Sequence, residues 1–428
     1  MTVVGSKTQR SLNSTLNPSF GVLLLFLLLF SGPPKLRMRD PGASLEGLID
    51  WSILLNVSAW IIGGFWVWSK RKLWRLQDGF ALLPIEEKLT LLLFGFLAIS
   101  IGFSPAPAFS AFKVYQLIVT YAFIKTYVSE FGIPQLLKTL FWCCAILSLA
   151  DVLAGLIAPS LVFFESELGT LRFRGDLIAQ TGVVSLLGLI LLLTSQSDLP
   201  RKQWSFWFVV FGGVLVFSLM RTSYLAMVVV LVLAVIKRPA IPILKRLSTL
   251  AVLTAPLFLG FALSALDRYR KAEDIWTLSS RVGLWTYLLD ATVSQGPWLG
   301  LGYFAASRVY APEFNPELGT AHSAFMEIYV GGGLVSLSIF CLIWIIVATR
   351  TTKLFFQRSD RYAFAMVSLF CAALFLNLIG GELQAEPSGF CFWCLVAVLP
   401  AMVSGRYYRP QGIQVGRVGP GFGIATPK

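Results

Sequence analysis

Residues 267–333 read DRYRKAEDIWTLSSRVGLWTYLLDATVSQGPWLGLGYFAASRVYAPEFNPELGTAHSAFMEIYVGGG. They form the only long polar interval between the first and last apolar segments of this 428-residue chain, and they contain its single histidine, His322. Apolar runs of membrane-span length lie on both sides, and only helices satisfy their own backbone polar groups within lipid. The sequence therefore predicts an all-α polytopic membrane protein with one large loop outside the membrane.

The composition agrees with that class. The chain is 56% hydrophobic and 13% charged, with a mean hydropathy of +0.74, whereas soluble domains carry about 25% charged residues. The net charge of +13 is spread over short loops, as cytoplasmic loops of membrane proteins are, so we do not predict nucleic-acid binding. All six cysteines lie in apolar runs. This placement argues against a disulfide framework and makes core packing the favoured interpretation of Cys391 and Cys394.

Hydropathy predicts twelve transmembrane helices. The first, at 20–30, could also be the core of a signal peptide, but no cleavage motif follows it, so we retain it as a short span. The remaining spans are expected at 48–68, 84–104, 108–128, 136–158, 177–195, 204–220, 222–236, 247–266, 324–349, 362–381 and 388–404.

The distribution of lysine and arginine predicts the orientation. With the N-terminus in the cytoplasm, 23 of the 35 basic residues fall on cytoplasmic segments, although Lys35, Arg37 and Arg39 fall on the other side. The loop with His322 then faces the periplasm. The predicted organisation has nine spans in residues 1–266, a large periplasmic catalytic loop at 267–323, three spans in 324–404 and a disordered cytoplasmic tail at 405–428.

His322 and Arg281 are the first candidates for chemistry in the loop. A lone histidine is usually a packed or solvated residue, but this one stands at the mouth of a span, and imidazole can accept or donate a proton near neutral pH. Arg281 opens a segment with the pattern of an amphipathic helix that includes Trp285. It could meet lipid headgroups, or its guanidinium could hold a phosphate group through two oxygens at once.

Further arginines are expected on the same face. Arg221 separates two apolar runs, and Arg172 and Arg174 lie in another outer loop. Their alternatives are a snorkelling side chain and a solvated loop. Three loops that bring arginines to one face suggest an anionic substrate, and no acidic metal-binding motif appears there. The sequence therefore favours arginine clamping without metal or another cofactor.

The same stretch resembles the O-antigen ligase and polysaccharide polymerase superfamily. The resemblance covers residues 280–337 most clearly: Ser280-Arg281, Leu284-Trp285, the P-W-L-G-L-G turn at 297–302, His322-Ser323 and Glu327 six residues before Gly333. Ser323 stands where the family often has asparagine. Arg221 and Arg174 resemble the arginines of the family's outer loops.

The resemblance implies a metal-independent glycosyltransferase fold embedded in the membrane. The reaction would move a glycan from an undecaprenyl-diphosphate-linked donor to an acceptor, as a ligase, a polymerase or a protein O-oligosaccharyltransferase does. Arg221 and Arg281 would hold the diphosphate, His322 would activate the acceptor hydroxyl, Arg172 and Arg174 would assist, and Trp285 could stack on a sugar.

The expected location is the bacterial inner membrane, with the active site facing the periplasm. The expected partners are the lipid-linked donor, an acceptor sugar or lipid, membrane lipids and other polysaccharide-assembly proteins. Two alternatives remain open. One is a carrier or flippase for an anionic lipid-linked glycan, which the position of the charges at loop ends disfavours. The other is a structural membrane subunit.

Overall fold

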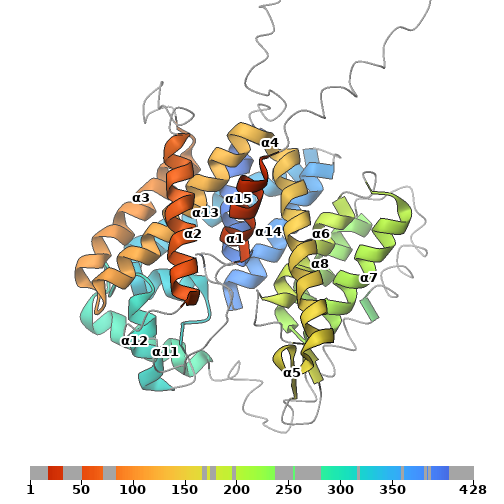
Figure 1. Cartoon of the computed structure of the whole chain (residues 1–428). Coiled ribbons are helices and arrows are strands. Elements are labelled where there is room, and N and C mark those ends of the chain that lie inside the picture. Colours follow the sequence, from red (N-terminus) through yellow and green to blue (C-terminus); the bar gives the residue numbers. More distant parts are fainter. Residues whose placement is uncertain are drawn as a thin grey trace, which may run out of the picture.

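The chain folds as a bundle of helices in a computed structural model, seen in Figure 1. The structure describes residues 18–31, 51–70, 83–165, 171–173, 180–194, 199–236, 254–255, 281–315, 319–357, 361–379, 383 and 387–403. The predicted span at 247–266, apart from two residues, and the predicted tail at 405–428 lie outside these ranges, as do Lys35, Arg37 and Arg39.

The helical prediction is confirmed, with one small exception: a two-stranded antiparallel hairpin of β1 (Phe163–Glu165) and β2 (Leu171–Phe173). The helices are α1 (Phe20–Ser31), α2 (Trp51–Ser69), α3 (Ile85–Ser100) with the short 3₁₀ turn η5 (Ile101–Phe103), α4 (Pro107–Ile157), α5 (Pro159–Val162), α6 (Thr181–Thr194), α7 (Arg201–Phe217), α8 (Arg221–Ile236), α11 (Arg281–Gln295), α12 (Ala305–Phe314), α13 (Ala324–Gln357), α14 (Arg361–Ile379) and α15 (Pro387–Val403).

Within the described residues, three helices are long and apolar enough to cross a membrane: α4, α13 and the Arg361–Leu378 part of α14. Shorter apolar helices accompany them, among them α1, α6, α8 and α15. These elements establish a membrane-type helical bundle. The number of twelve spans stays a prediction.

Helix α4 contains two of the predicted spans. Gly132 has φ +81°, which no helix contains, and Pro134 follows it without a backbone donor. The hydroxyls of Tyr127 and Thr139 are 2.8 Å apart, a distance that residues twelve apart in a straight helix could not reach. The chain therefore turns back at Gly132, and Figure 1 shows the two limbs of α4 meeting at the top of the bundle.

The turn at Gly132 marks one end of the bundle, which we call the Gly132 end. Ion pairs join helix termini there: Lys70–Glu130, Lys125–Glu87 and Arg350–Glu86. Helices α3 and α13 run from this region to the opposite end, where α11 and α12 lie (Figure 1). We call the opposite end the His322 end.

Helix α15 lies at the centre of the core and packs against α14, α4, α13 and α3. Its aromatic side chains Phe390, Phe392 and Trp393 are fully buried. Cys391 and Cys394 are buried beside them as free thiols, which agrees with the packing interpretation of their spacing. This core leaves the polar chemistry to the ends of the helices.

Candidate functional site

The turn at 297–302 is bound to the beginning of α13 through the backbone. Four hydrogen bonds join the two segments: Leu301 N to Val330 O (2.8 Å), Gly302 N to Gly331 O (3.1 Å), Leu334 N to Pro297 O (2.9 Å) and Val335 N to Trp298 O (3.3 Å). Because backbone pairs on both sides of Gly332 are involved, the turn and α13 hold each other in register. The loop and the span after it thus form one unit.

Glycine makes this approach possible at two positions. A Cβ on Gly300, which has φ +72°, would lie 2.5 Å from the carbonyl carbon of Gly331 and from the nitrogens of Gly332 and Gly333. Gly333 has φ +68° and interrupts α13. The span predicted at 324–349 lies within α13, and Gly333 divides this helix into a short entry helix, 324–332, and a longer one. Gly300 of the turn therefore allows close packing of the turn against the backbone of α13.

His322 lies directly before this entry helix, with φ +53°. Both backbone polar groups of the preceding residue, Ala321, are hydrogen-bonded to side chains. Its N–H donates to Glu327 Oε1 at 2.8 Å, and its carbonyl accepts the indole N–H of Trp285 at 2.7 Å. The second oxygen of Glu327 accepts the hydroxyl of Ser307 at 2.6 Å. The backbone that presents His322 is therefore fixed by three elements, α11, α12 and α13.

Arg281 is the first described residue of α11, where the amphipathic pattern predicts the helix to begin. It lies one turn before Trp285 on the same helix face, so the bond from Trp285 to Ala321 brings the Arg281 face of α11 to the His322 segment. Leu284 and Leu288 are buried against α12 and α13, whereas the next residue, Leu289, is 39% exposed. Arg281, Trp285 and His322 are all half-buried.

Arg221 reaches the same end of the bundle from another set of helices. It begins α8, which packs against α14 and α6. Thr181, at the start of α6, donates to Asp151 in the last turns of α4, far from the Gly132 turn. A Cβ on the next residue, Gly182, would lie 3.0 Å from Met220, the neighbour of Arg221. Arg221 and Arg281 therefore lie at the same end of the bundle, on different helix groups.

The other predicted arginines, Arg172 and Arg174, precede both helix groups along the chain. Arg172 belongs to β2, where its backbone is paired with that of Phe164. Arg174 lies outside the described residues. The roles of Arg172, Arg174, Arg221, Arg281, His322 and Trp285 stay predictions.

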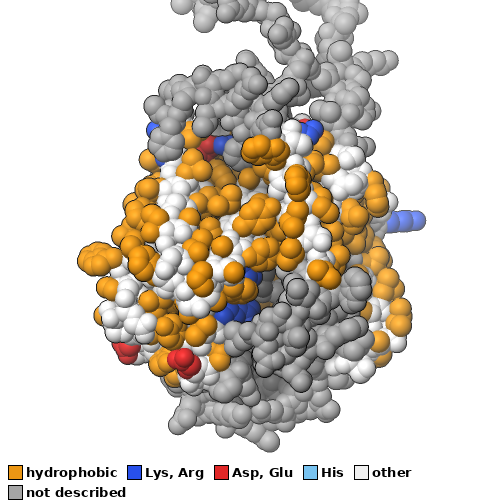
Figure 2. All heavy atoms as spheres, turned by 60° about the vertical axis from the view of Figure 1, so that its left-hand side comes forward, with side chains coloured by type: hydrophobic (Ala, Val, Ile, Leu, Met, Phe, Trp, Pro, Cys, Tyr) orange, Lys and Arg blue, Asp and Glu red, His pale blue; other side chains and the backbone are white. Residues whose placement is uncertain are grey.

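Two cations that the sequence interpretation missed lie near the same site. Lys113 of α4 and Arg308 of α12 approach the ring of Phe304, with Lys113 Nζ at 4.5 Å and Arg308 Cζ at 5.2 Å from its centroid. Figure 2 shows a group of Lys and Arg side chains in a hollow low on one face, with hydrophobic side chains around it. Lys113 could have been found, because a lysine inside an apolar run is a functional candidate in a membrane helix.

Helices α11 and α12 are also joined at their surface. Tyr287 donates its hydroxyl to Glu313 Oε2 at 2.7 Å, and this hydrogen bond is the main cause that raises the pKa of the Tyr287 phenol. Within the part of the chain that the structure describes, no three His, Cys, Asp or Glu side chains come together as metal ligands.

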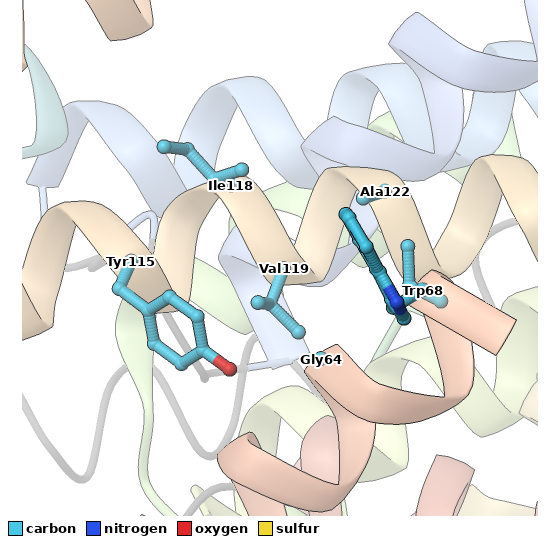
Figure 3. A pocket seen from close by; sticks show the side chains of 7 residues that line it. Gly64, Trp68, Tyr115, Ile118, Val119 and Ala122 are labelled. Carbon is cyan, nitrogen blue, oxygen red and sulfur yellow. The ribbon is translucent and has the colours of Figure 1, made fainter. Parts of the chain in front are cut away.

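An apolar groove between α2 and α4 contains none of the predicted residues. Its lining includes Trp68, Tyr115 and Ile118, which Figure 3 shows along the two helices. The Tyr115 hydroxyl donates to the backbone carbonyl of Trp60 at 3.0 Å, so its polar atom is already used within the fold.

A comparison with protein families matches the part of the chain that contains Arg221, Arg281 and His322. Residues 204–341 match the model of a family described as O-antigen ligase. The chain carries an O-antigen ligase domain. The matched segment includes Arg221, Arg281 and His322, and it ends inside α13. No curated protein matches the chain. Together, the domain and the apolar helices indicate a bacterial inner-membrane protein with a role in glycan transfer.

Proposed function

We propose that this O-antigen ligase-type protein transfers a glycan from an undecaprenyl-diphosphate-linked donor to an acceptor hydroxyl at the periplasmic face of the inner membrane. The observation that carries the proposal is the double anchoring of Ala321, because it joins the Arg281 helix to the His322 segment within the matched domain. Arg281, which would bind the anionic group, and His322, which would accept the proton, then face one reaction site.

The chemistry follows from these residues. His322 accepts the proton of the acceptor hydroxyl, and the hydroxyl oxygen attacks the anomeric carbon of the donor sugar. The bond between that carbon and the diphosphate oxygen breaks, and the diphosphate leaves with an additional negative charge. Arg281 and Arg221 stabilise this charge through bidentate hydrogen bonds, so the step does not require a metal.

The periplasmic side is inferred from the charges. The His322 end is separated from the Gly132 end by the length of the bundle. Lys70, Lys125 and Arg350 lie at the Gly132 end, and they belong to the predicted cytoplasmic segments that together hold 23 of the 35 basic residues. Basic residues favour the cytoplasmic side. The segment 267–323 then acts as the catalytic loop between the first nine spans and the last three.

The test is to replace His322 with Ala and Arg281 with Ala in the native host and to measure carrier-linked glycan beside finished surface polysaccharide. Both variants should accumulate carrier-linked glycan and lose the product. A single accumulated repeat unit indicates a polymerase, and a long accumulated chain indicates a ligase. Arg201→Ala, an exposed arginine at the start of α7, is the matched control with normal output.

Normal product in both variants, at normal protein level, would refute this site. The carrier alternative is tested separately with purified protein in sealed vesicles. Movement of lipid-linked glycan across the bilayer without a new glycosidic bond would favour a flippase over a transferase.

A further inference from the structure

Two cations from different helices meet at one aromatic ring near His322. Since Lys113 Nζ and Arg308 Cζ each lie within 5.2 Å of the Phe304 centroid, the two charges are at most about 10 Å apart and repel each other. Attraction to the ring contributes about 0.5–2 kcal/mol per cation. An anion near both charges would remove the repulsion, because it would attract each of them.

Arg308 has an unused donor. Its Nε is buried and has no hydrogen-bond partner in the described part of the chain, and no described carboxylate lies within 4.0 Å of its guanidinium. A buried donor without a partner costs about 1–3 kcal/mol. Guanidinium groups bind phosphate oxygens through two parallel hydrogen bonds. Phosphate chemistry is therefore the best match to this side chain.

The cluster is held by the backbone. Phe304 has φ +63°, which is rare for a side chain of this size. The carbonyl of the preceding Tyr303 accepts the hydroxyl of Ser110 at 2.9 Å, and Ser110 lies one turn before Lys113 on α4. The start of α4 and the start of α12 are thus fixed against each other, and so are the two cations.

The same cluster adjoins the His322 segment. A Cβ on Gly319, three residues before His322, would lie 2.9 Å from Arg308 Nη1. The residue next to Arg308, Ser307, donates to Glu327, which holds Ala321. The guanidinium therefore lies against the backbone that presents His322.

The residues around Lys113 and Arg308 indicate that this cluster lies at the level of the lipid headgroups. Aromatic side chains of this end are exposed, among them Phe103 (57%), Phe109 (39%) and Trp298 (64%). Exposed aromatic residues at the ends of membrane helices gather at the membrane–water interface. Lys113 lies on α4, one turn after Phe109, so the cluster lies where lipid phosphates are found.

We propose that Lys113 and Arg308 form a second anion subsite, which binds a lipid-borne phosphate beside His322. This inference rests on the proposed function, in which Arg221 and Arg281 hold the donor diphosphate. The subsite would take either a carrier-lipid diphosphate or the phosphate of an ordinary phospholipid. Both share the chemistry that the two cations recognise.

The experiment measures binding of undecaprenyl diphosphate to the purified full-length protein in nanodiscs of phosphatidylcholine. Lys113→Gln and Arg308→Gln should each lower the affinity about tenfold or more, because each removes a charge-assisted contact. Lys113→Arg and Arg308→Lys keep the charge and should retain more affinity than the glutamine variants. Lys202→Gln, at an exposed position on α7, should bind as the unchanged protein does.

A second arm adds phosphatidylglycerol to the nanodiscs. If it displaces undecaprenyl diphosphate from the unchanged protein but not from the double variant K113Q/R308Q, the subsite takes phospholipid phosphate. If phosphatidylglycerol displaces undecaprenyl diphosphate from neither protein, the subsite takes the carrier lipid. Both results agree with a lipid-phosphate site.

Equal affinity of the double variant and the unchanged protein for both lipids would overturn the inference. This failure is distinct from that of the proposed function. If His322→Ala abolishes transfer while the double variant binds and transfers normally, the transferase stands without the subsite. If the unchanged protein forms no glycosidic bond but the glutamine variants still lose affinity, the subsite stands without the transferase.

Discussion

Glu327 accepts the backbone N–H of Ala321 at 2.8 Å, and this bond fixes the peptide that leads into His322. The carboxylate is only 2% exposed, and its other oxygen accepts the hydroxyl of Ser307. A buried carboxylate is tolerated when donors surround it. Here the donors come from the approach to His322 and from α12, so Glu327 acts as a positioning residue for the site.

Replacing Glu327 with Ala should therefore disturb both stability and transfer. The N–H of Ala321 would lose its acceptor, at a cost of about 1–3 kcal/mol for a buried group left unpaired, whereas the hydroxyl of Ser307 would keep the carbonyl of Phe304 as acceptor at 3.1 Å. We expect transfer to fall at least tenfold and the thermal unfolding temperature in detergent to decrease. Glu327→Gln keeps one acceptor oxygen and should lie between Ala and the unchanged protein. Full activity of Glu327→Ala would contradict the positioning role.

The indole of Trp285 offers a milder test of the same segment. Trp285→Phe keeps an aromatic ring but removes the N–H that donates to Ala321 at 2.7 Å. One neutral hydrogen bond contributes about 0.5–1.5 kcal/mol, so we expect a loss of transfer of about two- to tenfold with little change in protein level. Trp298→Phe is the control, because its ring is 64% exposed. Equal activity of the two variants would show that the indole bond does not position His322.

The helices were predictable because hydropathy depends on local runs of residues. Span boundaries agree with α2, α3 and α6 to α8 within a few residues, and the turn between two spans was placed around Gly132. The break at Gly333 was not predicted. It depends on the turn at 297–302, which meets α13 only after folding.

The candidate site was predictable in part for a related reason. Arg281 and His322 stand out as polar residues at helix ends in one loop. Lys113 and Arg308 lie almost two hundred positions apart along the chain, and tertiary contacts such as the Ser110–Tyr303 hydrogen bond and the Phe109–Phe304 ring pair bring their helices together. Glu327 drew attention only as part of a motif, because its role as an acceptor for Ala321 and Ser307 depends on the tertiary fold.

At the Gly132 end, the ion pair of Arg350 with Glu86 should be needed for stability. Their atoms are 2.5 Å apart, and the Glu86 side chain is fully buried. Arg350→Met would leave the carboxylate without its charge partner, which costs about 3–5 kcal/mol for a buried pair. We expect a clear loss of thermal stability. The double variant Glu86→Gln with Arg350→Met should recover much of it, and no recovery would mean that the pair is not the cause.

The orientation of the bundle predicts which exposed positions a membrane-impermeant maleimide reaches. Asp290 on α11 and Lys202 on α7 are both exposed, at opposite ends of the bundle. Asp290→Cys should be labelled in intact cells with a permeabilised outer membrane, and Lys202→Cys only after lysis. The six native thiols are buried or half-buried, so the unchanged protein measures the background. The reverse pattern would place the His322 end in the cytoplasm.

The backbone contact between Gly300 and α13 gives the sharpest packing prediction. Gly300→Ala would place a methyl group 2.5 Å from three backbone atoms of residues 331–333, at a φ of +72° that alanine rarely adopts. Backbone atoms of a hydrogen-bonded segment cannot move aside cheaply, so the turn would separate from α13, and His322 would lose its support. We expect low protein level and loss of transfer. Gly212→Ala in α7, where a Cβ would meet nothing within 4 Å, should be neutral or slightly stabilising, because alanine favours helix over glycine by about 1 kcal/mol. If both variants behave alike, the contact between the turn and α13 does not determine how His322 is presented.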